Sequence, residues 1–439
     1  MHPESKRAGS TKTQLNDGFS DLPESILVII LSHLPTVEAV RTCVLSKSWR
    51  TMWTNVTALQ FDDKRHRAPR DDGFIQFVDL VVRHVGSLRI NSFHLYSVNP
   101  YDETPIISWL SKVIECNLQK LVITWYELES VNFSPLFASL GTLVELRLRT
   151  KTILDISAPA LLPNVKFFTL EDARIFNTSS LSGNISLSFP VLETFEATSV
   201  CWFRTDTVII DSPLLRVFEM LKCSSGHVPN SNGECTISLL APKLEKITFS
   251  GHGSEKMFLS FPPSLPDAYL SLTGEWAHPP EWPKKFLENF TCVKSLGLEL
   301  ISDHHVIKVP KFRQLVYLLL IYDMTEPYLL KSFLKSTPIL EMLSICDSRY
   351  HGFEPTSESL EEMRSQTAAE CVRKKLKVLQ IRGFKIREPQ LSVLRHVIAN
   401  AEVLGAVILS TSSKPITEKD KALVLSYPKA SPHASVFFD

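Results

Sequence analysis

The stretch "LVELRL", residues 143–148, decides the fold of this chain because its spacing returns many times along the sequence. An apolar residue is followed three positions later by a second, and two positions later by a third. The last three positions alternate as in a β-strand, so the second and third apolar side chains point to one face. The pattern predicts one short strand per copy, with all three apolar residues in a shared core.

Further copies of the pattern occupy most of the chain. They begin at Val165, Leu192, Leu215, Leu244, Val293, Leu315, Leu340, Leu376 and Leu404, and weaker copies begin at Ile90, Leu118 and Leu265. From Ile90 to Leu340 the mean spacing is about 25 residues, within the roughly 20–29 residues typical of leucine-rich repeats.

The segments between the strands complete the predicted architecture. Five copies are preceded by a proline that ends the returning segment, and residues 326–337 and 390–404 have the spacing of amphipathic helices. Strand, helix and parallel strand in repetition predict a curved α/β solenoid with a sheet on the inner wall and helices outside. The alternative is a doubly wound α/β domain, but no glycine-rich phosphate loop follows a strand.

The first sixty residues do not share this repeat. Residues 22–34 predict a helix with a broad apolar stripe that ends at Pro35, and residues 37–44 and 46–53 predict two more short helices. Three helices in about 35 residues are too few to bury so much apolar surface alone. The sequence therefore predicts that a second polypeptide covers part of the stripe. The alternative is a helical cap that shields the open end of the first repeat.

Residues 22–53, "LPESILVIILSHLPTVEAVRTCVLSKSWRTMW", closely resemble an F-box, with two Leu-Pro steps and the run Val-Leu-Ser-Lys-Ser-Trp-Arg. Three C-terminal stretches resemble, in order, the FBD region: "KLKVLQIRGF", "LRHVIANAEVLGAVIL" and "SYPKASPHASVFF". Together with the repeats, the chain resembles plant F-box/FBD/leucine-rich-repeat proteins over nearly its whole length. We expect a disordered tail at 1–19, an F-box at 20–56, a linker and first helical cap at 57–85, leucine-rich repeats at 86–346, and FBD-like repeats with a cap at 347–439.

The resemblance implies the substrate-recognition subunit of an SCF-type (Skp-cullin-F-box) ubiquitin ligase, which binds the Skp-type adaptor and, through it, cullin. By position, the adaptor-facing residues are Leu22, Pro23, Ile26, Leu27, Ile30, Leu31, Leu34, Pro35, Val40, Val44, Leu45 and Ser46. Trp49, Arg50 and Trp53 are expected to close the three-helix unit. Two other classes remain open: a non-degradative scaffold bound to the adaptor, and a repeat-based ligand-binding or interaction protein.

The substrate is expected to be a protein that docks on the inner sheet. Outward positions between the patterned residues carry both signs of charge, which suits a protein better than nucleic acid. The candidates are Arg147, Lys166, Glu193, Glu196, Arg216, Glu219 and Lys246, together with Trp276 and Trp282 of "GEWAHPPEWP". For each of them a merely solvated position is the alternative. Aromatic residues just after strands are further candidates: Trp125, Tyr126, Trp202, Phe203 and Tyr322.

From composition and motifs, we expect that the protein is not an enzyme. We also expect that it binds neither nucleic acid nor a membrane. The 47 basic and 47 acidic residues cancel, and no apolar run approaches the roughly 18–20 residues of a membrane span. No His-Glu-x-x-His, Gly-x-Ser-x-Gly or Walker motif occurs, so we expect no catalytic residue, metal or cofactor. Eight scattered cysteines without a Cys-x-x-Cys pair, and no leader-like N-terminal segment, predict a cytoplasmic and/or nuclear protein.

Overall fold

The computed structural model describes most of the chain as two compact units. The described residues are 22–65, 73–85, 90–99, 101, 103–125, 130–132, 140–151, 153–155, 160–177, 184–226, 235–252, 257–273, 281–301, 307–324, 327–347, 368–411 and 415–439. The first unit comprises Met1–Ser97 and Thr104–Leu118, and the second comprises Val98–Glu103 and Gln119–Asp439.

The first unit contains the helical segment predicted at the N-terminus. Its elements are α1 (Glu24–Ser32), α2 (Thr36–Arg41), η1 (Thr42–Val44), α3 (Trp49–Met52), η2 (Trp53–Asn55), β1 (Ala58–Asp62), η3 (Asp63–Arg65), α4 (Gly73–Val85), β2 (Ser92–Ser97) and α5 (Glu103–Ile114). Pro23 and Pro35 directly precede α1 and α2. Proline is compatible with a helix start because the first helical turn leaves N–H groups without an intrahelical partner.

Strand β1 was not expected in the stretch that the sequence predicts to be a linker and helical cap. It pairs in parallel with β2, with Phe61 opposite Leu95. Leu59, Phe61 and Phe93 are buried, and the Phe61 ring packs on Phe77 of α4 and on Phe93 of β2. The strand-and-helix repetition therefore begins before Ile90, the first copy found by spacing.

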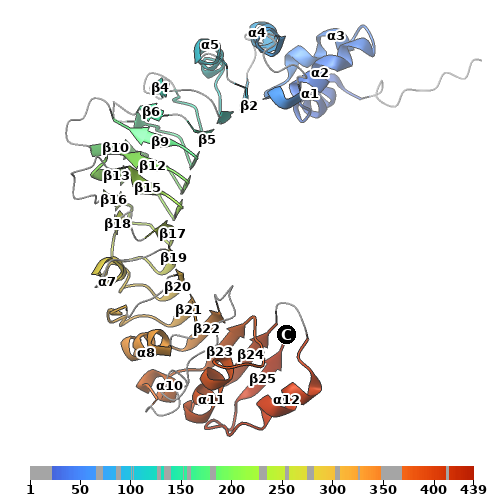
Figure 1. Ribbon diagram of the computed structural model, residues 1–439. Coiled ribbons are helices and arrows are strands. Elements are labelled where there is room, and N and C mark those ends of the chain that lie inside the picture. Colours follow the sequence, from blue (N-terminus) through green and yellow to red (C-terminus); the bar gives the residue numbers. More distant parts are fainter. Residues whose placement is uncertain are drawn as a thin grey trace, which may run out of the picture. The chain divides into compact units, whose positions relative to one another are not determined.

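A long ladder of parallel strands forms the second unit (Figure 1). Its strands are, in ladder order, β3 (Lys120–Trp125), β5 (Glu145–Thr150), β8 (Phe167–Glu171), β11 (Thr194–Thr198), β14 (Val217–Leu221), β17 (Lys246–His252), β19 (Asp267–Thr273), β20 (Ser295–Ile301), β21 (Tyr317–Tyr322), β22 (Met342–Asp347), β23 (Val378–Arg382), β24 (Ala406–Ser410) and β25 (Ser435–Phe438).

The repeat pattern predicts the core of this unit correctly. In the copy that begins at Leu143, the three patterned leucines are all buried, and the same holds for every strong copy through Leu404. Equivalent residues of neighbouring strands are paired, as Phe195 is with Phe168 and Phe218. The rings of Phe195 and Phe218 stack with centroids 5.4 Å apart. The predicted α/β solenoid with parallel strands is confirmed.

In the middle repeats, the described returning segments are strands (Figure 1), so the expectation of helices outside the sheet does not hold for them. The returning segments of the middle repeats form two further parallel sheets. One contains β7 (Ala160–Leu161), β10 (Asn184–Ser188), β13 (Thr207–Asp211), β16 (Cys235–Leu240) and β18 (Met257–Ser260). The other contains β4 (Ser130–Asn132), β6 (Ile153–Asp155), β9 (Arg174–Phe176), β12 (Cys201–Phe203) and β15 (Ser224–Gly226).

Local sequence explains these extra strands. Segments such as "TVIID" of β13 are short, alternate in burial and are rich in β-branched residues, which favour strands over helices. The chain also turns a sharp corner after β8, β11 and β14. Asp172, Ser199 and Lys222 occupy this corner with φ of 56°, 55° and 52°. A residue in the left-handed region ends the strand and lets the next short strand begin two positions later.

Helices cover the later repeats, and the sequence predicts two of them, at residues 326–337 and 390–404. The helices of these repeats are α7 (Glu281–Glu288), α8 (Pro327–Ser336), α10 (Glu370–Lys374), α11 (Gln390–Asn400) and α12 (Glu418–Leu425). Phe286 of α7 packs on Phe249 of the ladder, with ring centroids 4.9 Å apart. Among the described residues, no helix has the length and apolar character needed to cross a membrane.

Candidate protein-binding surfaces

Helix α1 is apolar on two sides, and only one of them is covered. Leu27 and Leu31 lie in the core of the first unit, with exposed fractions of 5% and 1%. Ile26, Ile29 and Ile30 remain exposed, at 42%, 54% and 40%. Because residues four apart share a helix face, Leu27 and Leu31 form one row, and Ile26 and Ile30 form a neighbouring row. One row holds the unit together and the other faces solvent.

The last residue of η1 and the residue after it are even more open. Val44 and Leu45 have exposed fractions of 83% and 64%. We use the term exposed apolar set for the residues Leu22, Ile26, Ile29, Ile30, Val44 and Leu45. Full burial of each such side chain is worth about 1.5–3 kcal/mol. A partner that covered this set would therefore gain a large free energy from burying its apolar side chains.

The predicted adaptor-facing residues do not all belong to this set. Leu27 and Leu31 are corrected: both are buried by the first unit itself, so they support the fold rather than face a partner. Pro23 and Ser46 are exposed, whereas Leu34, Pro35 and Val40 are half-buried. Ile29 is exposed and was missed, because it lies outside the predicted stripe, beside the Ile26–Ile30 row and away from Leu27 and Leu31.

The two tryptophans differ in burial. Trp53 is buried, and its ring lies 6.1 Å from that of His84 at the end of α4. Trp49 is half-buried and Arg50 is exposed. Trp53 thus lies between the helical segment and α4, whereas Arg50 is open to solvent.

Two side-chain hydroxyl groups hydrogen-bond helices α1 and α2 to the backbone of β1 and of the residue before it. The buried Thr36 Oγ1 accepts a hydrogen bond from Gln60 N at 2.7 Å, and Ser32 Oγ accepts one from Thr57 N at 3.1 Å. These donors lie on or next to the outer edge of β1, where unpaired backbone groups are otherwise costly. The helical segment is thereby held in one position on its own unit.

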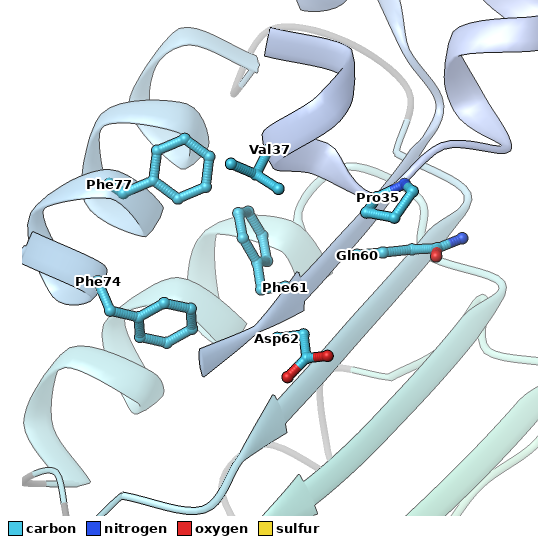
Figure 2. A pocket seen from close by; sticks show the side chains of 7 residues that line it. All are labelled: Pro35, Val37, Gln60, Phe61, Asp62, Phe74 and Phe77. Atoms are coloured by element: carbon cyan, nitrogen blue, oxygen red, sulfur yellow. The ribbon is translucent and has the colours of Figure 1, made fainter. Parts of the chain in front are cut away.

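A small pocket lies between α2, β1 and α4 (Figure 2). Phe61, Phe74, Phe77, Val37 and Pro35 supply its apolar wall. Figure 2 places Gln60 and Asp62 at its edge, so the polar groups comprise one amide and one carboxylate. This lining offers no pairing of nucleophile and base, and we interpret the pocket as a packing gap beneath α2.

The candidate substrate residues occupy the exposed face of the ladder in the second unit. Arg147, Glu196 and Glu219 fall in one cross-strand row, because Arg147 pairs with Thr169, Thr169 with Glu196, and Glu196 with Glu219. Lys166, Glu193, Arg216 and Lys246 lie at or just before the strand starts. Arg147, Glu196 and Glu219 thus share one face of the ladder, with Lys246 beside Glu219, while Lys166, Glu193 and Arg216 lie at the end where the strands begin.

Charges on this face are largely paired with one another. Lys166 contacts Glu193 at 3.0 Å, Arg216 contacts Glu245 at 2.9 Å, and Lys246 approaches Glu219 at 3.7 Å. Arg147 contacts Glu145 at 2.6 Å and Lys120 contacts it at 3.0 Å. Burial pushes the pKa of Glu145 upward, but the two cations outweigh it, so this pKa lies below its ordinary value. Exposed pairs add at most about 1 kcal/mol of stability each, so this face can exchange them for a partner's charges.

Most of the aromatic candidates prove to be core residues. Trp125, Trp202 and Tyr322 are buried. Phe203 is half-buried beneath Arg204, whose guanidinium lies 5.3 Å from the ring. Tyr126 and Trp276, and the side chain of Trp282, lie outside the described residues.

No cluster of metal ligands occurs in the part of the chain that the structure describes. All eight cysteines are free thiols. Burial raises the pKa of Cys223 and that of Cys235 to about 12, so both stay protonated at neutral pH. A protonated, buried thiol is a poor nucleophile.

Comparison with known proteins finds a matching family for the N-terminal helices and another for the C-terminal repeats. Residues 19–59 match the F-box domain family, and residues 365–409 match the FBD family. The chain is 60% identical to the F-box/FBD/LRR-repeat protein At3g14710 of Arabidopsis thaliana, over 100% of both chains. It is 27% identical to the F-box/FBD/LRR-repeat protein At2g26030 of the same plant, covering 92% of this chain and 94% of the relative. A putative F-box/FBD/LRR-repeat protein, At1g66290, also of Arabidopsis thaliana, is 26% identical over 93% and 90% of the two chains.

Proposed function

The chain belongs to the F-box/FBD/LRR-repeat family, and on this premise we propose that it is the substrate-recognition subunit of an SCF-type ubiquitin ligase. F-box domains in general bind a Skp-type adaptor. In this proposal, the first unit binds the adaptor and the second unit binds a protein substrate.

The exposed apolar set carries the proposal. Its six aliphatic side chains remain open although the first unit has its own core, formed by residues such as Leu27, Leu31 and Phe61. Soluble proteins rarely leave several large aliphatic side chains open within one short helical segment without a binding partner. Binding costs much of the gross gain in lost freedom and side-chain order, yet enough remains for a stable complex.

The second unit supports the substrate half of the proposal. Its exposed sheet face carries interspersed charges of both signs, with Arg147, Glu196 and Glu219 in one row. Such a face suits a folded or extended protein segment. The chain then acts without a catalytic group of its own, since holding a substrate lysine near a charged ubiquitin carrier raises its effective concentration. The site of action we propose is the cytoplasm and/or the nucleus.

Adaptor retention tests the first step. The full chain carrying Val44→Asp and Leu45→Asp should lose the adaptor in a pull-down, because two carboxylates would have to be desolvated in an apolar interface. Leu80→Asp is the matched control, since Leu80 is an exposed leucine of α4 in the same unit. It should retain the adaptor at the wild-type level.

The remaining steps have separate readouts. Cullin and ubiquitin conjugates should accompany the wild-type chain and disappear with the double variant. If the adaptor is retained but cullin and conjugates never accompany it, the non-degradative scaffold is the correct class. If the wild-type chain fails to retain the adaptor, the ligase assignment is wrong, and an interaction protein built on repeats takes its place.

A further inference from the structure

The exposed face of the ladder differs between its earlier and its later strands. From β3 to β17, every Lys, Arg and acidic side chain on this face except Glu196 has an ion-pair partner. From β20 to β24, the described strands place only two charged side chains on it, Glu299 and Arg382. Their other residues on this face are uncharged, and Met342 among them has an exposed fraction of 42%. A partner thus meets paired charges on the earlier strands, and two separate charges on a mostly apolar surface on the later ones.

No described residue forms an ion pair with either of these two charges. The Glu299 carboxylate accepts one hydrogen bond, from Tyr269 Oη at 3.4 Å. The Arg382 side chain is exposed and donates only from Nε, to Gln380 Oε1 at 3.4 Å. Both bonds are long for their type, and a carboxylate can accept several hydrogen bonds while a guanidinium has five N–H donors. Both groups therefore keep most of their capacity for a partner of opposite charge.

One cross-strand row connects the two charges. Glu299 pairs with Ile321, Ile321 pairs with Cys346, and Cys346 pairs with Arg382. Ile321 and Cys346 are half-buried, so part of each side chain is open to solvent. Three strand spacings of about 4.8 Å separate the ends of the row, which places the two charged positions about 14 Å apart.

The thiol in the row is under the influence of both charges. Burial makes the largest contribution and raises the pKa of Cys346. The carboxylates of Asp347 and Glu299 raise this pKa further, whereas Arg382 lowers it. Glu299 and Arg382 thus lie near enough to Cys346 to act on one bound group together.

The length of the row fits an extended chain better than a helix. An extended segment rises about 3.4 Å per residue, so four residues span about 14 Å, and the side chains at i, i+2 and i+4 share one face. A helix rises 1.5 Å per residue and would need about nine residues, or two and a half turns. Its two charged side chains would then point to opposite sides.

We propose that the row from Glu299 to Arg382 binds an extended protein segment with a basic and an acidic residue four positions apart and an apolar residue midway between them. The basic group pairs with Glu299, the acidic group pairs with Arg382, and the apolar side chain rests on Ile321 and Cys346. The identification of this segment as part of a substrate rests on the proposed ligase function. The binding itself does not depend on that function.

The charges favour this position over the earlier strands. There, a charged partner has to replace pairs that already exist, such as that of Lys246 with Glu219, and the exchange of one exposed pair for another brings little net gain. At Glu299 and Arg382, new pairs form without the loss of old ones. The opposite signs at the two ends also exclude a phosphate backbone, which needs one sign throughout.

Fluorescence anisotropy with two labelled peptides and the full chain tests the proposal. Their cores are Lys-Ser-Leu-Ser-Glu and Glu-Ser-Leu-Ser-Lys, one for each chain direction, and comparison peptides carry the two charges three or five positions apart. At least one of the two should bind about 10-fold or more tightly than its comparison peptides. A shift of one residue turns one charged side chain to the other face of an extended segment.

Charge reversal shows where the peptide binds. Glu299→Lys should weaken binding of the preferred peptide by about 10-fold or more, because two cations then oppose each other. A peptide with Glu in place of its Lys should bind this variant and not the wild-type chain. Arg382→Glu should give the mirror result with a peptide whose Glu is replaced by Lys.

Glu171→Lys is the matched control. Glu171 lies in the same cross-strand row as Glu299, five strands earlier in the ladder. This variant should bind the preferred peptide like the wild-type chain, and circular dichroism should show all three variants folded. The proposal is overturned if neither peptide binds, if all spacings bind equally, if the reversed peptides do not restore affinity, or if Glu171→Lys causes the same loss.

An adaptor pull-down on the same preparations separates this result from the fate of the ligase proposal. A chain that retains the adaptor but binds neither peptide contradicts the proposed row alone. A chain that binds the peptide without retaining the adaptor supports the row and contradicts the ligase assignment.

Discussion

The helical segment 24–55 and the repeats of the second unit share apolar residues at regular spacing, yet those residues have different environments. In the repeats, patterned residues such as Phe218 and Leu296 are fully buried. In the helical segment, Leu31 is buried while its neighbour Ile30 is exposed. Regular apolar spacing therefore identifies an amphipathic element in both regions. Only the structure shows whether the chain itself or a partner completes the burial.

The largest effect on stability should come from a residue of the repeat core. Phe218→Ala removes a ring that has no exposed surface and stacks on Phe195, and large-to-small changes of this kind cost about 3–5 kcal/mol. Urea denaturation should show this loss. Phe167→Ala, at an exposed position of the same sheet, should cost less than about 1 kcal/mol. Equal losses for the two variants would show that burial does not separate these positions.

A smaller loss of stability is expected at Gly297, where the face of the ladder is tightly packed. A Cβ atom at Gly297 would lie 2.5 Å from Cδ2 of Tyr269, whose ring therefore has to move. Gly297→Ala should cost about 1–3 kcal/mol through overpacking. The displaced ring also loses the hydrogen bond that Tyr269 Oη donates to Glu299 at 3.4 Å.

Gly405→Ala is the control for this prediction. A Cβ atom there would lie 3.6 Å from Lys377 O, an ordinary contact, so thermal melting should find it close to wild type. If the Gly297→Ala and Gly405→Ala variants have the same melting temperature, the Tyr269 ring is not fixed on the sheet as described.

In the first unit, the attachment of α2 to β1 should have a measurable cost when it is broken. Thr36→Val keeps the shape of the side chain but leaves Gln60 N without its acceptor, which should cost about 1–2 kcal/mol. Thr54→Val is the control, because the Thr54 hydroxyl only donates to Thr51 O within its own turn. Chemical denaturation should separate the two variants, and identical curves would mean that the buried hydroxyl does not anchor α2.

The smallest effect on stability should come from the exposed apolar set. Val44→Ala removes methyl groups that already lie in water, so the free energy of unfolding should change by less than about 0.5 kcal/mol. Its cost should appear only in adaptor binding. A destabilisation as large as that of Thr36→Val would show that Val44 supports the fold instead.

Sequence reasoning located the repeat core well because one rule governs it. Each strand alternates, so Leu146 and Leu148 had to share a face, and the structure buries both. The helices α8 and α11 were also found, because their spacing follows the period of 3.6 residues.

The same reasoning failed where the local sequence is compatible with two structures, such as strand or helix, or core or surface. The three-residue strand β12 carries too few positions to display a period, so the sequence pattern did not predict it. On α1, the sequence could not tell Leu31 from Ile30, because both are aliphatic and adjacent, and tertiary packing alone assigns one to the core. For Trp202, an aromatic residue after a strand was compatible with either core or surface.

The most direct test of the account is the adaptor affinity of Ile30→Asp, measured together with its melting temperature. Leu31→Asp serves as the companion variant and should unfold the first unit, because it buries a charge. We predict that Ile30→Asp melts like the wild-type chain and binds the Skp-type adaptor at least about 10-fold more weakly, a loss of about 1.4 kcal/mol or more. A folded Ile30→Asp variant with wild-type affinity would contradict the claim that α1 leaves its exposed row for a partner.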